Sequence, residues 1–170
     1  MSRTATNEIN STIANSQGQD RHGDQRQFVT FTVEGRSYAV DIMCVREIKA
    51  WTETTRLPHQ PDYMRGVLNL RGSIVPVQDL RSRFGMGETD ANGNHVVVIV
   101  VIEDRLLGIL VDTVSDILTV DAGQIKAIPQ GSVNVGEDFL EGLVNTDDGM
   151  VAILTLPLLF NKGFGDEPSQ

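Results

Sequence analysis

The sequence predicts an all-β protein with a few short helices, arranged as two small β-barrels in tandem. Two observations point to this fold class. The 170-residue chain contains one sequence unit twice. In the first unit apolar and polar residues alternate with the period of two that strands show, and in the second the matching runs are apolar throughout. A unit of about 60 residues with four or five short strands favours a barrel, because closure removes the exposed edges of an open sheet. We therefore expect a first barrel at residues 27–92 and a second at residues 93–164.

The duplication rests on two alignments within the chain. Residues 28–48 align with residues 97–117, and residues 63–84 align with residues 139–160, both without a gap. Few residues are identical, but the order of turns and apolar runs is the same in both copies. In the second alignment the identical pairs include Gly66/Gly142, Asn69/Asn145, Val75/Val151, Leu80/Leu156 and Phe84/Phe160.

Each copy is expected to form two β-hairpins. In the first copy the turns fall at Glu34–Arg36 and Arg71–Gly72, where charged residues and glycine separate apolar runs. In the second copy the turns fall at Glu103–Arg105 and Thr146–Gly149. The run Val96–Ile102 is apolar throughout, which favours a strand buried on both faces.

A short helical turn should follow the second hairpin of each copy. The first covers Asp79–Phe84, with Asp79 as the N-cap and Gly85 as the C-terminal stop. The second covers Leu156–Phe160, where the C-terminal helix of the second barrel has room to pack back on the first. Pro76 lies inside a strand and is expected at an edge or a bulge, because proline has no N–H for the ladder.

Charge is distributed unevenly along the chain. The net charge is −9, and residues 91–170 carry twelve of the 23 acids but three of the 14 bases. This excess predicts an acidic surface on the second barrel, which favours a basic partner surface. We expect neither nucleic-acid binding nor binding to an anionic membrane, because both depend largely on clustered lysine and arginine.

The ends of the chain and its cysteine count bound its environment. Residues 1–26 are polar and predict a disordered tail, and residues 165–170 predict a frayed end. Cys44 is the single cysteine, so the fold needs no disulfide and suits a reducing compartment. The longest apolar run is far shorter than the roughly 20 residues that cross a bilayer as a helix. We expect a soluble, cytoplasmic protein with no direct membrane insertion.

Enzyme and metal signatures are sparse. His22, His59 and His95 are far apart in the sequence and form no metal-binding spacing with Cys44. The chain contains no phosphate-binding glycine loop and no nucleophile elbow. Cys44 lies in an apolar stretch, which favours a buried hydrophobic role over that of a nucleophile. We therefore expect no catalytic site, no metal and no cofactor.

One pair of charges breaks the repeat. Glu47 and Arg71 carry opposite charges in the first copy, whereas their counterparts Asp116 and Asp147 carry like charges. A barrel fold does not require a pair that only one copy has. We therefore hypothesise that Glu47 and Arg71 meet and shape a surface for a partner. The alternative is two solvent-facing charges, whose pairing contributes on the order of 0–1 kcal/mol.

Four segments of the chain resemble a known family. They are similar to the successive motifs of CheW-type chemotaxis coupling proteins, and they read DIMCVREI (41–48), LPHQPDYMRGVLNLRGSIVPVQDLRSRFG (57–85), LGILVDTVSDIL (107–118) and FLEGLVNTDDGMVAIL (139–154). The resemblance covers residues 27 to about 160. It implies a fold of two SH3-like five-stranded β-barrels, which agrees with the duplication.

The resemblance implies a non-enzymatic adaptor of chemotaxis signal transduction. Such proteins couple the cytoplasmic tips of methyl-accepting chemotaxis receptors to the histidine kinase CheA in membrane-associated arrays, with barrel-to-barrel contacts to the CheW-like regulatory domain of the kinase. Family positions where change disturbs coupling match Val45, Glu47, Gly66 and Arg71, and Gly108 matches a glycine near the groove between the barrels. The two glycines alternatively mark crowded backbone. We expect a monomer in isolation.

The receptor tip is expected to dock as a helix in the groove between the barrels. Ile42, Val45 and Ile48 would line this groove if they are partly exposed. Core packing is the alternative for all three, and we favour it for Ile42. Gln78 and Thr155 depart from the residues that the family usually has there, which bears on partner specificity and leaves the class intact.

Other functions stay open. Within the superfamily the alternatives are a CheV-like coupler and a detached kinase regulatory domain. Too few residues follow Phe160 for the receiver domain of about 120 residues that a CheV-like protein carries. A different class is a small enzyme or ligand-binding barrel that uses the cleft between the barrels as a pocket. That class requires titratable residues that converge in the cleft, and the sequence offers no clear set.

Overall fold

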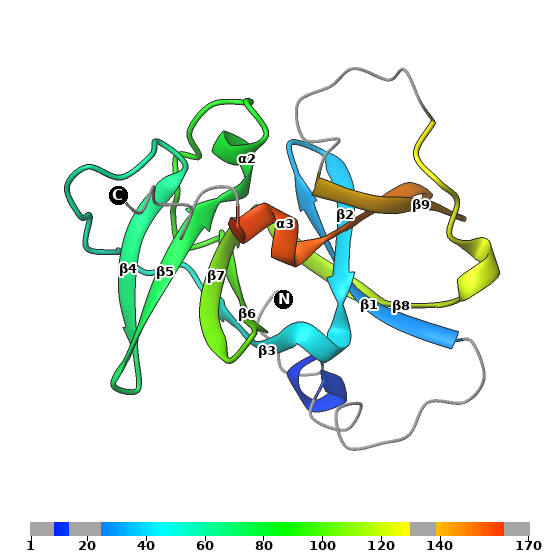
Figure 1. Ribbon diagram of the computed structural model, residues 1–170, viewed down its shortest axis with the longest axis horizontal. Helices are drawn as coiled ribbons and strands as arrows, with labels where there is room; N and C mark the ends of the chain where they lie inside the picture. The colour runs from blue at the N-terminus through cyan, green and yellow to red at the C-terminus, as the bar shows by residue number, and fades with distance from the viewer. Residues whose placement is uncertain (1–8, 14–24, 130–138, 162–170) are drawn as a thin grey trace.

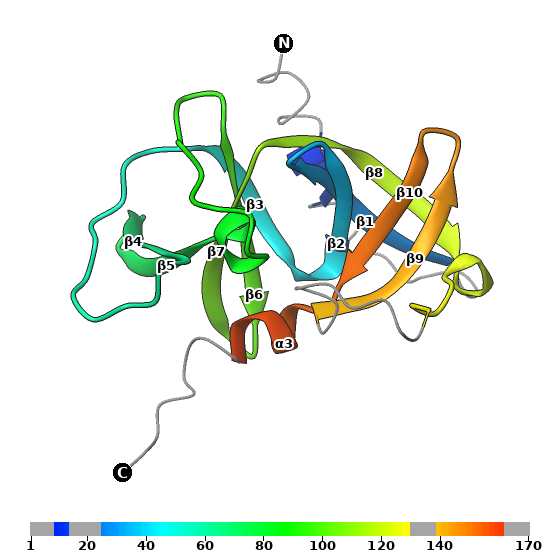
Figure 2. The same ribbon diagram turned by 90° about the horizontal axis from the view of Figure 1, so that it is seen from above.

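The computed structural model describes residues 9–13, 25–129 and 139–161. These residues form ten strands in two five-stranded sheets, with short helices between strands (Figure 1). Figure 2 shows the two sheets side by side, with α3 (Leu156–Asn161) at their junction. The predicted fold class, all-β with short helices and two five-stranded units, is confirmed.

The first copy folds into the two hairpins that the sequence predicts. Its elements are β1 (Gln25–Val33), β2 (Arg36–Asp41), η1 (Ile42–Cys44), β3 (Val45–Ala50), β4 (Met64–Leu70), β5 (Ser73–Asp79) and α2 (Leu80–Arg83). The turn between β1 and β2 places Glu34 and Gly35 at φ values of 54° and 75°, the left-handed conformation of tight hairpin turns.

The second copy repeats this order. Its elements are β6 (Val96–Ile102), β7 (Arg105–Val111), β8 (Thr113–Asp121), η2 (Ala122–Gln124), β9 (Leu140–Thr146), β10 (Gly149–Leu154) and α3. The turn between β6 and β7 again uses left-handed residues, Glu103 at φ 52° and Asp104 at φ 68°.

Helix α2 begins and ends where the sequence predicts. The backbone N–H of Ser82 donates to the Asp79 carboxylate at 3.4 Å, so Asp79 is the N-cap. Gly85 follows with φ 79°, a left-handed conformation that ends the helix. Pro76 lies in β5 opposite Val67 of β4, while the pairing of β5 with β7 begins only at Val77. Pro76 therefore has no ladder partner on its β7 side, as expected for an edge position.

The internal duplication is visible in the strand order. It is β8–β1–β2–β10–β9 in one sheet, which we call sheet A, and β3–β6–β7–β5–β4 in the other, sheet B. Replacing each strand by its counterpart in the other copy converts one order into the other. In both sheets a parallel pair joins the copies, β2 with β10 in sheet A and β7 with β5 in sheet B.

The boundary between the two units needs correction. Each sheet contains strands of both copies, so barrels at residues 27–92 and 93–164 do not describe the sheets. The chain passes from sheet A to sheet B through η1, and it returns through Asp112, the single residue between β7 and β8. Both copies offer equivalent strand edges. For this reason the sequence repeat does not determine which copy a strand pairs with.

The acidic residues of the second copy are consequently divided between the sheets. Glu103 and Asp104 are exposed in the turn of sheet B, whereas Asp121, Asp147 and Asp148 are exposed on sheet A. The acidic excess is therefore not confined to a barrel made of the second copy, but most of it lies on sheet A, which also exposes Asp116 and Glu141.

Each sheet closes on itself through a segment outside the named strands. In sheet B, Thr55 forms an isolated bridge with Val67 of β4, with N···O distances of 2.8 and 2.9 Å. In sheet A, Lys126 forms the corresponding bridge with Leu143 of β9, at 2.7 and 2.8 Å. Thr55 follows the edge strand β3, and Lys126 follows the edge strand β8. Each bridge therefore links the two edges of its sheet, as a small barrel requires.

Apolar side chains pack in three regions. One cluster takes residues from both sheets and lies between them, and it includes Phe31 of β1 and Ile109 of β7. A second cluster is confined to sheet B and a third to sheet A. Strand β6 serves both the first and the second cluster, because Val98 and Ile99 point to opposite faces and both are fully buried. The prediction that Val96–Ile102 is buried on both faces is confirmed.

Residues 9–13 correct the prediction of a disordered tail over residues 1–26. They are helical, and Ile9 and Ile13 are 5% and 2% exposed in the cluster between the sheets. Residues four positions apart share one face of a helix, so these two isoleucines bury together. Strand β1 also begins within the predicted tail, at Gln25. The tail predictions for residues 1–8, 14–24 and 165–170 lie outside the described residues.

Candidate functional site

Glu47 and Arg71 form the ion pair that the sequence analysis expects. Glu47 lies on the edge strand β3, just after an irregularity in the β3–β6 register, and Arg71 lies in the turn between β4 and β5. Arg71 Nη2 donates to Glu47 Oε2 at 2.6 Å. Since β3 and β4 are the outer strands of sheet B, the pair spans the two edges of this barrel.

The exposure of the pair makes it a surface feature. The Arg71 side chain is 71% exposed and the Glu47 side chain 25%. An ion pair in this setting adds little stability, on the order of 0–1 kcal/mol. In sheet A the counterpart Asp116 instead accepts the backbone N–H of Ile117 at 2.7 Å. The Glu47–Arg71 pair therefore distinguishes one barrel surface from the other.

Two hairpin tips expose large apolar side chains at equivalent positions of the repeat. Ile74 on β5 is 63% exposed, and its counterpart Met150 on β10 is 55% exposed. Ile74 lies near Arg71 in the chain, and we call these two residues the basic tip. Met150 lies near the exposed Asp147 and Asp148, and we call these three residues the acidic tip. The sequence analysis missed both apolar residues, because in a strand of alternating burial only the structure shows which face is open.

The three isoleucine and valine positions proposed for the groove are buried. Ile42, Val45 and Ile48 are 1%, 0% and 3% exposed, and all three belong to the cluster between the sheets. The partial exposure that lining the groove requires is therefore absent for these three residues, and the core alternative, favoured above for Ile42, describes their burial. Residues 9–13 contribute Ile9 and Ile13 to the same cluster.

Gly66 and Gly108 both occupy crowded backbone positions. Gly66 has φ 128°, and a Cβ there would lie 2.3 Å from the carbonyl oxygen of Thr55, the residue that closes sheet B. Gly108 lies between β6 and β5, where a Cβ would be 3.1 Å from methyl groups of Val77 and Val97. Both glycines are buried inside sheet B. Any effect they have on a partner is therefore exerted through the shape of the barrel.

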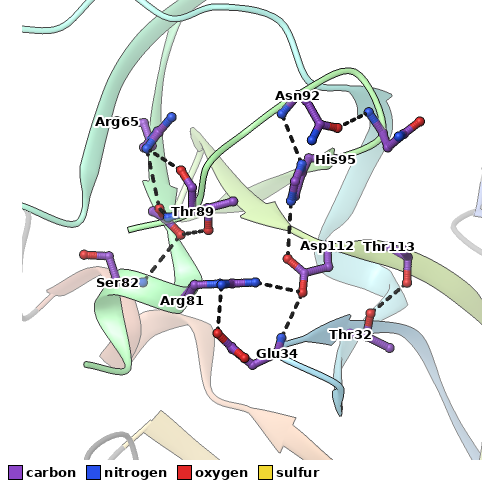
Figure 3. A network of polar contacts seen from close by, with 12 residues as sticks. Thr32, Glu34, Arg65, Arg81, Ser82, Thr89, Asn92, His95, Asp112 and Thr113 are labelled. Carbon is purple, nitrogen blue, oxygen red and sulfur yellow. Dashed lines mark hydrogen bonds and ion pairs between the residues drawn. The ribbon is translucent and has the colours of Figure 1, made fainter. Parts of the chain in front are cut away.

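A polar network joins the two sheets near Asp112 (Figure 3). Asp112 Oδ2 accepts the backbone N–H of Glu34 at 2.9 Å and the Arg81 guanidinium at 3.4 Å. Arg81 also contacts the Glu34 carboxylate at 2.8 Å, and His95 Nε2 lies 3.6 Å from Asp112 Oδ1. Glu34 belongs to the β1–β2 turn of sheet A, whereas Arg81 and His95 belong to segments beside sheet B. The network therefore fixes the orientation of one sheet on the other.

The buried carboxylate of Asp79 is satisfied by a second group of polar contacts, also drawn in Figure 3. Besides capping α2, Asp79 accepts from the backbone N–H of Thr89 at 2.7 Å and from its hydroxyl at 2.6 Å. Arg65 Nη1 lies 3.7 Å from the same carboxylate. These bonds satisfy a charge with 0% exposure, so Asp79 is structural. Gln78 beside it is 1% exposed, and its side-chain amide has no hydrogen-bond partner among the residues that the structure describes.

The described residues offer little for chemistry. Burial, with the nearby Asp41 charge as a second cause, raises the pKa of the Cys44 thiol, which is the opposite of what a nucleophile requires. Among residues 9–13, 25–129 and 139–161, no three His, Cys, Asp or Glu side chains group as metal ligands would. Over the same part of the chain, no helix has the length and apolar character to cross a membrane.

Comparisons with known proteins agree on one family. Residues 27–164 match the family described as CheW-like domain. A probable chemotaxis protein CheW from Rhizobium etli is 39% identical over 137 residues, which are 81% of this chain and 88% of that protein. The chemotaxis protein CheW from Klebsiella aerogenes is 35% identical over 137 residues, 81% of this chain and 82% of that protein. The crystal structure of the scaffolding protein TtCheW from Thermoanaerobacter tengcongensis is similar with a TM-score of 0.74 and 32% identity, covering 84% of this chain and 92% of that one.

Proposed function

Because the chain belongs to the CheW family of chemotaxis scaffolding proteins, we propose that it couples methyl-accepting chemotaxis receptors to a CheA-type histidine kinase. Members of this family are scaffolds and adaptors and not enzymes, so the chain acts through its surfaces. The coupling takes place in the cytoplasm, at receptor arrays associated with the membrane. The chain is a monomer until it enters such an array.

The observation that carries the kinase part of this proposal is the pair of hairpin tips. The basic tip and the acidic tip occupy equivalent places on the two sheets, and each exposes one large apolar side chain. A CheW-like regulatory domain in the kinase offers tips of the same architecture. Docking a basic tip on an acidic tip buries an apolar centre inside a rim of opposite charges, the usual composition of a specific interface.

The two tips also explain how an alternating assembly can form. A contact between two different surfaces is heterologous, so after the first contact one molecule keeps a free acidic tip and the other a free basic tip. Adaptor and kinase domain can then alternate until a ring closes. A single self-complementary patch would instead stop at a dimer.

The receptor part of the proposal uses the surface beside β3. A helical receptor tip docks along this edge strand, with Glu47 and Arg71 giving it a charged border. Ile42, Val45 and Ile48 form the apolar base under this surface. Gly66 and Gly108 act indirectly, because they allow the close backbone and side-chain packing that shapes sheet B.

Co-sedimentation with receptor-containing membranes tests the proposal. The chain should pellet with such membranes, and more of it should pellet when a CheA-type kinase is added. A folded sample that stays in the supernatant under both conditions would refute the adaptor function.

Charge reversal tests both surfaces, because Arg71 belongs to the basic tip and to the border of the receptor surface. Arg71→Glu should weaken binding to the isolated kinase regulatory domain by about threefold to tenfold, because the basic tip then repels an acidic one. Lys126→Glu is the matched control, since Lys126 is an exposed cation that belongs to neither tip. In the Glu47→Arg/Arg71→Glu double variant the ion pair is restored in reverse. If this double variant binds the receptor no better than the single variants, the pair does not shape the receptor surface.

A further inference from the structure

Residues 9–13 lie on the surface that the proposed function assigns to the receptor. They form a short helical segment, drawn in blue in Figure 1, that is hydrogen-bonded to Ile48 of β3. Ile9 and Ile13 are 5% and 2% exposed and pack in the cluster that contains Ile42, Val45 and Ile48. The part of the chain that sequence composition assigns to a tail thus covers the predicted apolar base of the receptor site.

Asn10 ties this segment to the edge of sheet B. Its side-chain Nδ2 donates to the carbonyl oxygen of Ile48 at 3.3 Å, and its Oδ1 accepts the backbone N–H of Ile48 at 3.2 Å. Strand β3 is an edge strand, and Ile48 uses these two groups on its outer side. One carboxamide therefore satisfies a donor and an acceptor that an incoming chain could otherwise use.

The contacts of residues 9–13 are ones that an incoming helix can replace. A short helical segment is not stable by itself, so the helical state depends on its packing. Two isoleucine side chains and one bidentate amide contribute to that packing. Ordering the segment costs entropy, which offsets much of what the burial of two such side chains contributes. A helix that supplies the same contacts can therefore compete with the segment.

We propose that residues 9–13 are an internal helical ligand that a receptor helix must displace, so that the segment lowers the affinity of the chain for receptors. This inference rests on the proposed function. It also specifies the displacing partner: an amphipathic helix with two aliphatic residues four positions apart and a side chain beside the first of them that can pair with the Ile48 backbone. The segment itself has this pattern in Ile9, Asn10 and Ile13.

The opposing view is that residues 9–13 are a permanent part of the core. The two views predict opposite changes in receptor affinity when the segment is removed. Removing a permanent core segment opens a cavity and weakens receptor binding or leaves it unchanged. Removing a competing ligand strengthens receptor binding by the inverse of the undocked fraction.

The affinity for receptors can be measured by fluorescence anisotropy. The probe is a labelled helical-hairpin fragment from the cytoplasmic tip of a methyl-accepting chemotaxis receptor. The Ile9→Ser/Ile13→Ser variant should bind the fragment about threefold to tenfold more tightly than the unchanged chain. Asn10→Ala should give a smaller gain in the same direction. Ser11→Ala is the matched control, because Ser11 is the exposed residue of the same helical segment. Affinity for the kinase regulatory domain should be the same for all four proteins.

Hydrogen exchange on the unchanged chain gives a second measurement that no folding defect of a variant can disturb. Adding the receptor fragment should speed the exchange of the amides of residues 9–13. Equal or slower exchange there, or equal or weaker fragment binding by the double isoleucine variant, would overturn displacement while leaving the adaptor function intact. If neither the unchanged chain nor the variant binds the fragment, the proposed function and this inference both fail.

Discussion

Replacing Gly66 by alanine should destabilise the fold by about 3–5 kcal/mol. Gly66 has φ 128°, a conformation that costs a residue with a side chain on the order of 1–3 kcal/mol. A Cβ would also lie 2.3 Å from the Thr55 carbonyl oxygen, which belongs to backbone and must move. Moving it breaks the two hydrogen bonds between Thr55 and Val67, each contributing about 1 kcal/mol.

Thermal unfolding followed by circular dichroism measures this loss. For a chain of this size each kcal/mol corresponds to roughly 2–4 °C, so the Tm should fall by roughly 6–20 °C. Gly35→Ala is the matched control, because Gly35 has φ 75° and no atom within 4 Å of the added Cβ. It isolates the conformational cost from the clash. Gly142→Ala should fall between the two, since its Cβ would lie 2.8 Å from the Lys126 carbonyl oxygen without a left-handed φ.

Equal Tm losses for Gly66→Ala and Gly35→Ala would refute the reasoning, because the closing bridge of sheet B would then tolerate a side chain. The same pair of variants also bears on function. If Gly66 acts through the barrel, its variant should lose partner binding in proportion to its loss of folded protein. A folded variant that fails to bind would instead place Gly66 in direct contact with a partner.

Three other predictions concern stability and reactivity. Arg71→Ala should change the free energy of unfolding by less than about 1 kcal/mol in urea titration, because its partner Glu47 pairs with it in solvent; a larger loss would make the pair structural. Asp112→Ala should lower it by about 1–3 kcal/mol by leaving the Glu34 N–H and Arg81 without their acceptor, and no loss would mean that the network does not hold the sheets. Alkylation of Cys44 by iodoacetamide should be slower than that of free cysteine at about pH 8 and should increase only at higher pH, because burial raises the pKa of this thiol; a faster rate than free cysteine would contradict that direction.

Local residue patterns were sufficient to predict the strands, the turns and one ion pair. A hairpin turn such as Glu34–Gly35 depends on a few adjacent residues with special φ values, and the N-cap at Asp79 depends on one side chain and the next three residues. Glu47 and Arg71 were recognisable because they break a repeat that is otherwise symmetric. Each of these features is determined within a short stretch, or by comparing two aligned stretches.

Other features could not be predicted from the sequence, because they depend on contacts between segments that are far apart in the chain. Both copies present the same edges, so the exchange of strands between the sheets has no local signal. Asp112 is one acid among many until its position between β7 and β8 brings it to Glu34 of the other sheet. Ile9 and Ile13 are two apolar residues in a polar segment, and only their packing partners distinguish them from a tail.

The exchange of strands between the two copies has a consequence for how the chain folds. A fragment that ends after the first copy would hold two strands of sheet A and three of sheet B, leaving both barrels open at their edges. Neither half can therefore serve as an independent folding unit. Strand β1 pairs with β8, so this pairing forms only after the residues of β8 have been synthesised. Folding should be slow and all-or-none, with calorimetric and van't Hoff enthalpies that agree. A scaffolding protein gains rigidity from this arrangement, because neither barrel can loosen without the other.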